Sequence, residues 1–131
     1  MSDKSTVLRA FNTHFFEFVD DVIAVIEDND ELKYAKKSLE TIKKANPTLI
    51  VKVWYSMVFI PYKDVIEAGN IDFFFDKDYK QEAAQFPNSD EIMKIVDKLR
   101  EPIRQMNDVN KQHSMKFIQN LSQLSLLYSA S

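Results

Sequence analysis

The stretch PTLIVKVWYSMVFI, residues 47–60, decides the fold of this chain. Apolar side chains fill most of its positions, so no face of the segment stays polar along its length. A helix that is apolar all round is packed on several sides, which places this segment at the centre of a core. Its many β-branched residues leave a buried strand as an alternative. The length of the run and the proline at its start favour a helix.

Proline and glycine residues mark the limits of this central helix and of the turns that follow it. Asn46 can cap the helix, with Pro47 in its first turn. Pro61 lacks an amide hydrogen, so the helix kinks or ends there. Residues 62–68 are expected to continue for another turn or two. Gly69 then suits the left-handed position that closes a helix.

The chain before the central segment predicts two further helices. Residues 6–26 carry apolar side chains at helical spacing, and residues 29–45 carry a narrower apolar stripe surrounded by lysines. Asp28 can cap the second of these helices, with Glu31 returning the bond in a capping-box arrangement.

The chain after Gly69 is also predicted to be helical. A helix is expected over residues 71–85, capped by Asn70 and closed by the Phe86-Pro87 pair. The pattern from Ser89 to Tyr128 stays helical but is too long for one ordinary globular helix. Pro102 predicts either a kink or a division into two helices.

We therefore predict an all-α fold, a single-domain bundle of five to six helices over residues 1–131 with a long C-terminal helix that is kinked or divided. The single glycine agrees with this, because an average composition of about 7% would give roughly nine. Turn-rich barrels, sandwiches and glycine-rich phosphate loops need more glycine. The absence of cysteine excludes disulfide scaffolds, cysteine-based zinc sites and thiol nucleophiles.

Charges are distributed in blocks along a chain whose net charge is −3. Residues 17–31 contain seven acidic residues and no basic one, whereas lysines dominate residues 32–52. The overall balance gives no general attraction to nucleic acid. The alternating blocks indicate either solvated faces or a surface that docks a partner.

The sequence predicts neither a signal peptide nor a membrane span. The longest uncharged apolar-rich stretch before the C-terminal region, Val53–Tyr62, has ten residues, about half of what a bilayer requires. We expect a soluble protein that is intracellular or part of a larger particle and is not secreted.

Catalytic, metal-binding and cofactor-binding motifs are not found in the sequence. The only histidines, His14 and His113, lie far apart. A calcium loop starting at Asp28 would need an oxygen ligand and a glycine where Leu32 and Lys33 stand. We expect no enzymatic activity, no cofactor, no metal and no small-molecule ligand.

Lysines on the predicted second helix support an alternative function in nucleic-acid binding. They could contact phosphates as point charges, although no arginine is present among them to read bases. The same residues could form a solvated face or a face directed at the acidic block. They are Lys33, Lys36, Lys37, Lys43 and Lys44.

The last fifteen residues, 117–131, carry no charge. The residues Phe117, Leu121, Leu124 and Tyr128 form an apolar stripe, and the other face is polar but neutral. An exposed helix usually carries charges for solubility. The stripe therefore predicts either packing into the core of the domain or a surface for a partner or a second copy.

Several segments together resemble uncharacterised small proteins encoded by nucleocytoplasmic large DNA viruses of algae and other protists. The segments are VLRAFN (7–12), FFEFVDD (15–21), AKKSL (35–39), IKKANP (42–47), PY (61–62), GNIDFF (69–74), KDY (77–79) and KFIQNLS (116–122). The resemblance implies a viral protein without enzymatic activity. It leads us to expect a minor structural protein of the virion or capsid, or an assembly protein, that contacts other viral proteins or itself. It also implies localisation in the virion or in the cytoplasm of the infected cell.

Overall fold

A computed structural model of the chain describes residues 3–26, 30–72 and 89–130, and within these ranges it contains helices and no strand. The predicted all-α class is confirmed. The helices are α1 (Lys4–Val25), α2 (Asp30–Ala45), α3 (Leu49–Trp54), the π-helical turn η1 (Tyr55–Phe59), α4 (Ile60–Glu67), α6 (Ser89–Arg104) and α7 (Asp108–Ala130).

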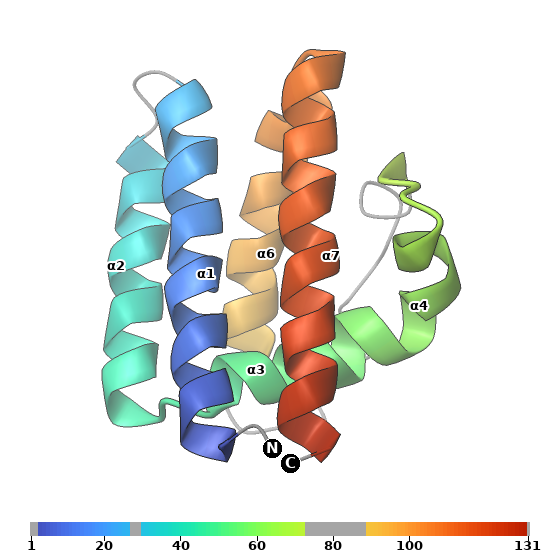
Figure 1. The fold of residues 1–131 in the computed structure, drawn as a ribbon. Helices are drawn as coiled ribbons and strands as arrows, with labels where there is room; N and C mark the ends of the chain where they lie inside the picture. Colours follow the sequence, from blue (N-terminus) through green and yellow to red (C-terminus); the bar gives the residue numbers. More distant parts are fainter. Residues whose placement is uncertain (1–2, 27–29, 73–88, 131) are drawn as a thin grey trace.

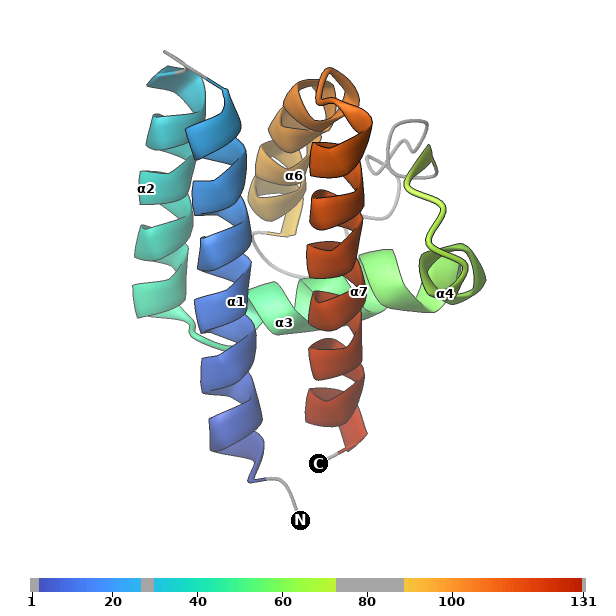
Figure 2. The same ribbon diagram turned by 45° about the horizontal axis from the view of Figure 1, so that its top comes forward.

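Four long helices stand side by side, and a fifth segment crosses them (Figure 1). Helices α1 and α6 run in one direction and α2 and α7 run in the other, so α1 and α7 are antiparallel neighbours. Helix α3 crosses behind α1 and α7 in this view, and α4 lies beyond α7 (Figure 2). The first turn of α1 and the last turn of α7 lie at the same end of the molecule.

The central segment is a buried helix, so the strand alternative is wrong. Five of the six residues of α3 are buried, and the exception is Lys52. The predicted cap is also wrong, because the helix begins at Leu49 and its N-cap is Thr48. Asn46 instead holds a short turn before the helix. Its Oδ1 atom accepts hydrogen bonds from the backbone N–H and the hydroxyl of Thr48, at 3.3 and 2.9 Å.

The helix kinks at Pro61, as predicted, and continues after the kink to Glu67. In η1 the amide of Ile60 donates to the carbonyl of Tyr55, which is the wider π spacing. Directly after the proline, Tyr62 has φ −126° and ψ 17°, outside helical values. A proline cannot donate to the preceding turn, so this break in the hydrogen-bond ladder occurs where the missing N–H would be.

Gly69 closes α4 in the left-handed conformation, with φ +76°, and the prediction for this residue is confirmed. Its amide donates to the Ile66 carbonyl, and the Asn70 amide donates to the Val65 carbonyl, both at 3.0 Å. These two bonds are those of a Schellman motif, which satisfies the last carbonyl groups of a helix. From α7, the Gln119 side-chain amide also donates to the Ile66 carbonyl, at 2.9 Å.

The long C-terminal pattern is divided into two helices, which was one of the two predicted outcomes. The division lies a few residues after Pro102, because α6 continues to Arg104 and accommodates the proline in its last turns. Asn107 then caps α7, with its Oδ1 atom accepting from the Asn110 amide at 2.8 Å. The predicted capping role of Asp28 and the predicted helix over residues 71–85 fall largely outside the described residues.

Aromatic side chains join α1 to the central helix. The rings of Phe11 and Phe15 lie 6.3 and 6.2 Å from Trp54, edge to face in both cases. Such pairs stabilise a core by about 0.5–1.5 kcal/mol beyond the area that they bury. Helix α1 is thereby fixed on α3 through one face, and its opposite face is left at the surface.

Candidate protein-contact surface

The apolar stripe of α7 lies mainly in the core. Leu121 is fully buried and Tyr128 is 8% exposed, whereas Phe117 and Leu124 are partly buried. Of the two possibilities that the sequence left open, core packing therefore describes Leu121 and Tyr128. These two side chains cannot form a partner surface while the fold is intact.

Two neutral polar residues of α7, Ser122 and Ser125, are buried in the interior of the fold. Ser122 Oγ accepts a hydrogen bond from Trp54 Nε1 at 3.0 Å, and Ser125 Oγ donates to the Ser122 carbonyl at 2.7 Å. Both serines are buried, and a charged side chain in their place would lose its hydration. The burial of these two serines therefore explains why this part of α7 carries no charge. Asn120 and Gln123 remain exposed.

A groove of about 700 Å³ lies between α1 and α7, on their outer side. The α7 wall contributes Asn120, Gln123 and Leu124, none of which is charged. Three of the six residues in the α1 wall have small side chains, and Arg9 and Glu17 carry charges. We call the six residues of α1 and the three of α7 the α1–α7 groove. The lining residues of α1 are Thr6, Arg9, Ala10, Thr13, His14 and Glu17.

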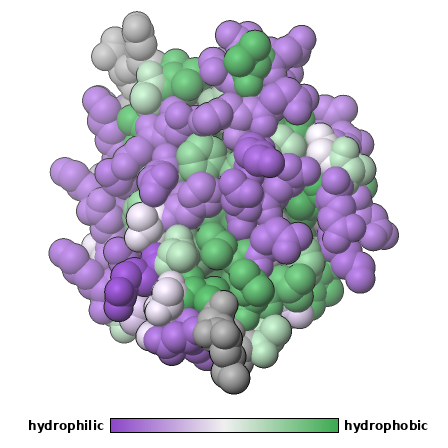
Figure 3. Space-filling view, in the orientation of Figure 1, coloured by the Kyte–Doolittle hydropathy of each residue, from purple (hydrophilic) through white to green (hydrophobic). Residues whose placement is uncertain are grey.

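Apolar side chains gather around the lower part of this face, over the C-terminal half of α7 and beside it (Figure 3). Leu127 lies one helical turn beyond Gln123 and Leu124 on α7, and it is 47% exposed. Its neighbour Leu126 is 38% exposed. The apolar character of the groove therefore extends toward the end of the helix.

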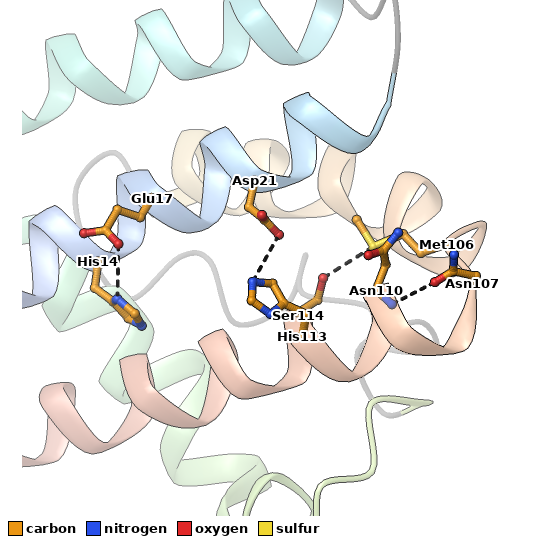
Figure 4. A network of polar contacts seen from close by, with 8 residues as sticks. All are labelled: His14, Glu17, Asp21, Met106, Asn107, Asn110, His113 and Ser114. Atoms are coloured by element: carbon orange, nitrogen blue, oxygen red, sulfur yellow. Dashed lines mark hydrogen bonds and ion pairs between the residues drawn. The ribbon is translucent and has the colours of Figure 1, made fainter.

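His14 of α1 and His113 of α7 lie along the seam between the two helices (Figure 4). The rings of His14 and His113 lie 4.7 and 5.3 Å from the Phe117 ring. Each histidine has a carboxylate of α1 nearby. His14 Nδ1 lies 4.0 Å from Glu17, and His113 Nε2 lies 3.9 Å from Asp21. Both histidine rings thus pack on Phe117. No group of three potential metal ligands occurs in the described part of the chain.

The lysines of α2 partly face the acidic residues of α1. Lys36 Nζ lies 2.6 Å from Asp20 and 3.8 Å from Glu40, and the bond to Asp20 is the main reason that its pKa is raised. Lys43 Nζ lies 5.3 Å from the centre of the Phe16 ring. Lys36 is thus directed at the acidic block, whereas Lys33 and Lys37 are exposed.

A cleft of about 430 Å³ between α1 and α2 is lined by both signs of charge. Its lining includes Lys36, Lys43 and Lys44, but also the carboxylates of Glu17, Asp20 and Glu40. Lys33 and Lys37 are exposed and do not line this cleft. Three of the five lysines therefore share this cleft with carboxylates, which offset part of their positive charge.

The sequence alone did not reveal the α1–α7 groove. Thr6, Ala10 and Thr13 are spaced as one face of a helix, but small and polar residues on such a face are also typical of ordinary solvent exposure.

None of the helices in the described ranges has both the length and the apolar character needed to cross a bilayer. No protein-family model matches this chain, and no curated protein or solved structure is significantly similar to it.

Proposed function

We propose that this protein is non-enzymatic and acts by binding another protein surface in the α1–α7 groove. In the viral setting that the resemblance implies, it is a minor structural protein of the particle or an assembly protein. The observation that carries the proposal is the groove itself. It is about 700 Å³ in volume and bounded on the α7 side by uncharged residues.

The shape of the groove favours a helix as the docking element. Thr6, Ala10 and Thr13 are exposed on one face of α1, and small side chains there let another backbone approach closely. Leu124 supplies apolar contact area beside them. Binding of one helix face in a groove between two helices is a common mode of protein recognition.

The alternative function is nucleic-acid binding by the lysines of α2. Its difficulty is electrostatic, because the contact of Lys36 with Asp20 and Glu40 offsets one of the five positive charges that it requires. A gel-shift experiment at low salt, with the lysines of α2 changed to glutamate, distinguishes it from the contact function.

Site-specific photo-cross-linking tests the proposed function. A photoreactive amino acid is placed at Gln123, in the groove, and a matched control carries it at Lys37, which is exposed on α2. In cells that produce the protein naturally, the label at position 123 should give a discrete protein adduct, and the label at 37 should not. Equal labelling from both positions, or none from 123, contradicts the proposal.

The particle-associated form of the proposal has a separate test. The protein should be found in purified particles by mass spectrometry and stay with them through density-gradient separation. A protein that is abundant in producing cells and absent from the particles would exclude a structural role.

A further inference from the structure

The uncovered face of α1 has a charge pattern that complements itself when the helix is reversed. On this face Arg9, Thr13 and Glu17 follow one another at intervals of four residues, so they lie along one ridge of the helix. All three side chains are exposed. When a second α1 is laid antiparallel with the two copies of Thr13 opposite each other, each Arg9 lies opposite the Glu17 of the other copy.

From this pattern we propose that the occupant of the α1–α7 groove is a second copy of this chain. The two copies are related by a two-fold axis that passes beside Thr13. This inference rests on the proposed contact function and names its partner. A two-fold interface is isologous, so one Arg9–Glu17 pair generates the other by symmetry.

The charges of the whole helix support the antiparallel direction. Within α1, residues 4–16 contain the basic residues Lys4 and Arg9 and no acidic one. The remaining part of α1 contains Glu17, Asp20 and Asp21 and no basic residue. Asp20 faces Lys36 and Asp21 faces His113 of the same chain, so Glu17 is the acidic residue that lines the groove. A parallel arrangement would bring like charges together, at a cost in binding free energy, whereas the antiparallel one brings opposite charges together.

Small side chains at the crossing point make the approach sterically possible. Thr13 and Ala10 lie between the two charged residues, and neither extends beyond a few atoms. The uncharged α7 wall, with Asn120, Gln123 and Leu124, then packs without leaving an unpaired charge in the interface.

The available area lies between the lower limit for a specific interface, about 500 Å² on each partner, and the standard size. Helix α1 has 22 residues and α7 has 23, so each is about 33 Å long at 1.5 Å per residue. Two neighbouring helices, each about 10 Å wide, offer a partner a face of roughly 650 Å² in projected area. A standard interface covers about 800 Å² on each partner.

Charge reversal combined with sedimentation equilibrium tests the proposal. The wild-type chain should show a monomer–dimer equilibrium between micromolar and millimolar concentration. Arg9→Glu and Glu17→Arg each place like charges opposite each other twice, so each should raise the dimer dissociation constant roughly 10-fold or more. The double variant Arg9→Glu/Glu17→Arg restores opposite charges and should recover the wild-type constant.

A mixture of the two single variants gives the sharpest result. In a heterodimer of Arg9→Glu with Glu17→Arg, both facing pairs are again of opposite charge, so the mixture should contain more dimer than either variant alone at the same total concentration. Lys37→Glu, on α2 and away from the groove, serves as the control and should leave the dissociation constant unchanged. Circular dichroism establishes that each variant is folded.

Three results would overturn the inference: a wild-type chain that is monomeric at millimolar concentration, single reversals that leave the dimer unaffected, or a folded double variant that fails to recover. The failure of this inference differs from the failure of the proposed function. A monomeric chain whose Gln123 label cross-links to a different protein refutes the dimer alone. A dimer whose label gives only self-adducts, in a protein absent from particles, excludes the particle-associated role.

Discussion

Trp54 and Ser122 are joined by a hydrogen bond in the core, with Trp54 Nε1 donating to Ser122 Oγ at 3.0 Å. Both side chains are buried, and 68 positions of the chain separate them. An indole N–H removed from water needs an acceptor. The bond therefore fixes the rotation of α7 on α3, and with it the direction in which the outer face of α7 points.

Removing this acceptor should destabilise the fold more than the size of a hydroxyl group indicates. Ser122→Ala leaves the indole N–H of Trp54 buried and unpaired, which costs about 1–3 kcal/mol. Urea unfolding followed by the fluorescence of Trp54, the only tryptophan, measures the loss. Ser129→Ala changes an exposed serine on the same helix and should cost less than about 0.5 kcal/mol. Similar losses in the two variants would show that the bond contributes little.

Substitution of Gly69 should be unfavourable because of its left-handed backbone conformation and not because a larger side chain would clash with its neighbours. A Cβ atom there would lie 3.6 Å from Gln119 Nε2, an ordinary contact, but φ is +76°. Gly69→Ala should therefore lower the free energy of unfolding by about 1–2 kcal/mol. Gly69→Asn should cost less, because asparagine tolerates left-handed angles better. Thermal unfolding checks both variants, and an alanine variant as stable as wild type would contradict the argument.

Local signals in the sequence were sufficient for most of the helices. Helical spacing of apolar residues predicted α1 and α2, and the all-apolar run predicted α3 as the centre. The kink after Pro61 and the left-handed Gly69 follow from the chemistry of those residues alone. The start of α3 was placed two residues too early, because the Asn46 side chain bonds to Thr48 and forms a turn that competes with a direct helix start.

The candidate site could not be predicted, because it depends on how two distant helices are paired. A neutral polar residue of α7 can lie either in the core or at the surface. The sequence does not show that Ser122 is buried and Gln123 is exposed. The contact with Trp54 buries the first of these and leaves the second in the groove. Only the packing of α1 on α7 brings Thr13 and Gln123 into one surface.

The ion pair between Lys36 and Asp20 should contribute a small, pH-dependent coupling. A double-mutant cycle with Lys36→Gln and Asp20→Asn should give about 0.2–1 kcal/mol, since both side chains are partly exposed. The pKa of Lys36 is raised above its ordinary value of 10.5, chiefly by the hydrogen bond to Asp20.

The sign of that shift fixes the pH range of the coupling. Because the pKa is higher in the folded state, the lysine contribution is fully present below pH 10.5 and is lost as the pH rises through the folded value. Urea unfolding at pH 7 and pH 9 should therefore give the same lysine contribution. A contribution that has already disappeared at pH 9 would show that the pKa in the folded state lies below 10.5, opposite to the expected direction.

Alanine variants of Leu121 and Leu124 should distinguish an effect on the stability of the fold from an effect on the binding of a partner. Leu121 is fully buried, so Leu121→Ala should cost about 2–5 kcal/mol in the free energy of unfolding. Leu124 is partly buried and lines the groove, so Leu124→Ala removes less buried area and should cost about half as much or less. The same Leu124 variant should raise the dimer dissociation constant, measured by sedimentation where the chain is still folded. If Leu124→Ala instead destabilised the fold as much as Leu121→Ala and left association unchanged, its side chain would belong to the core and not to the contact surface.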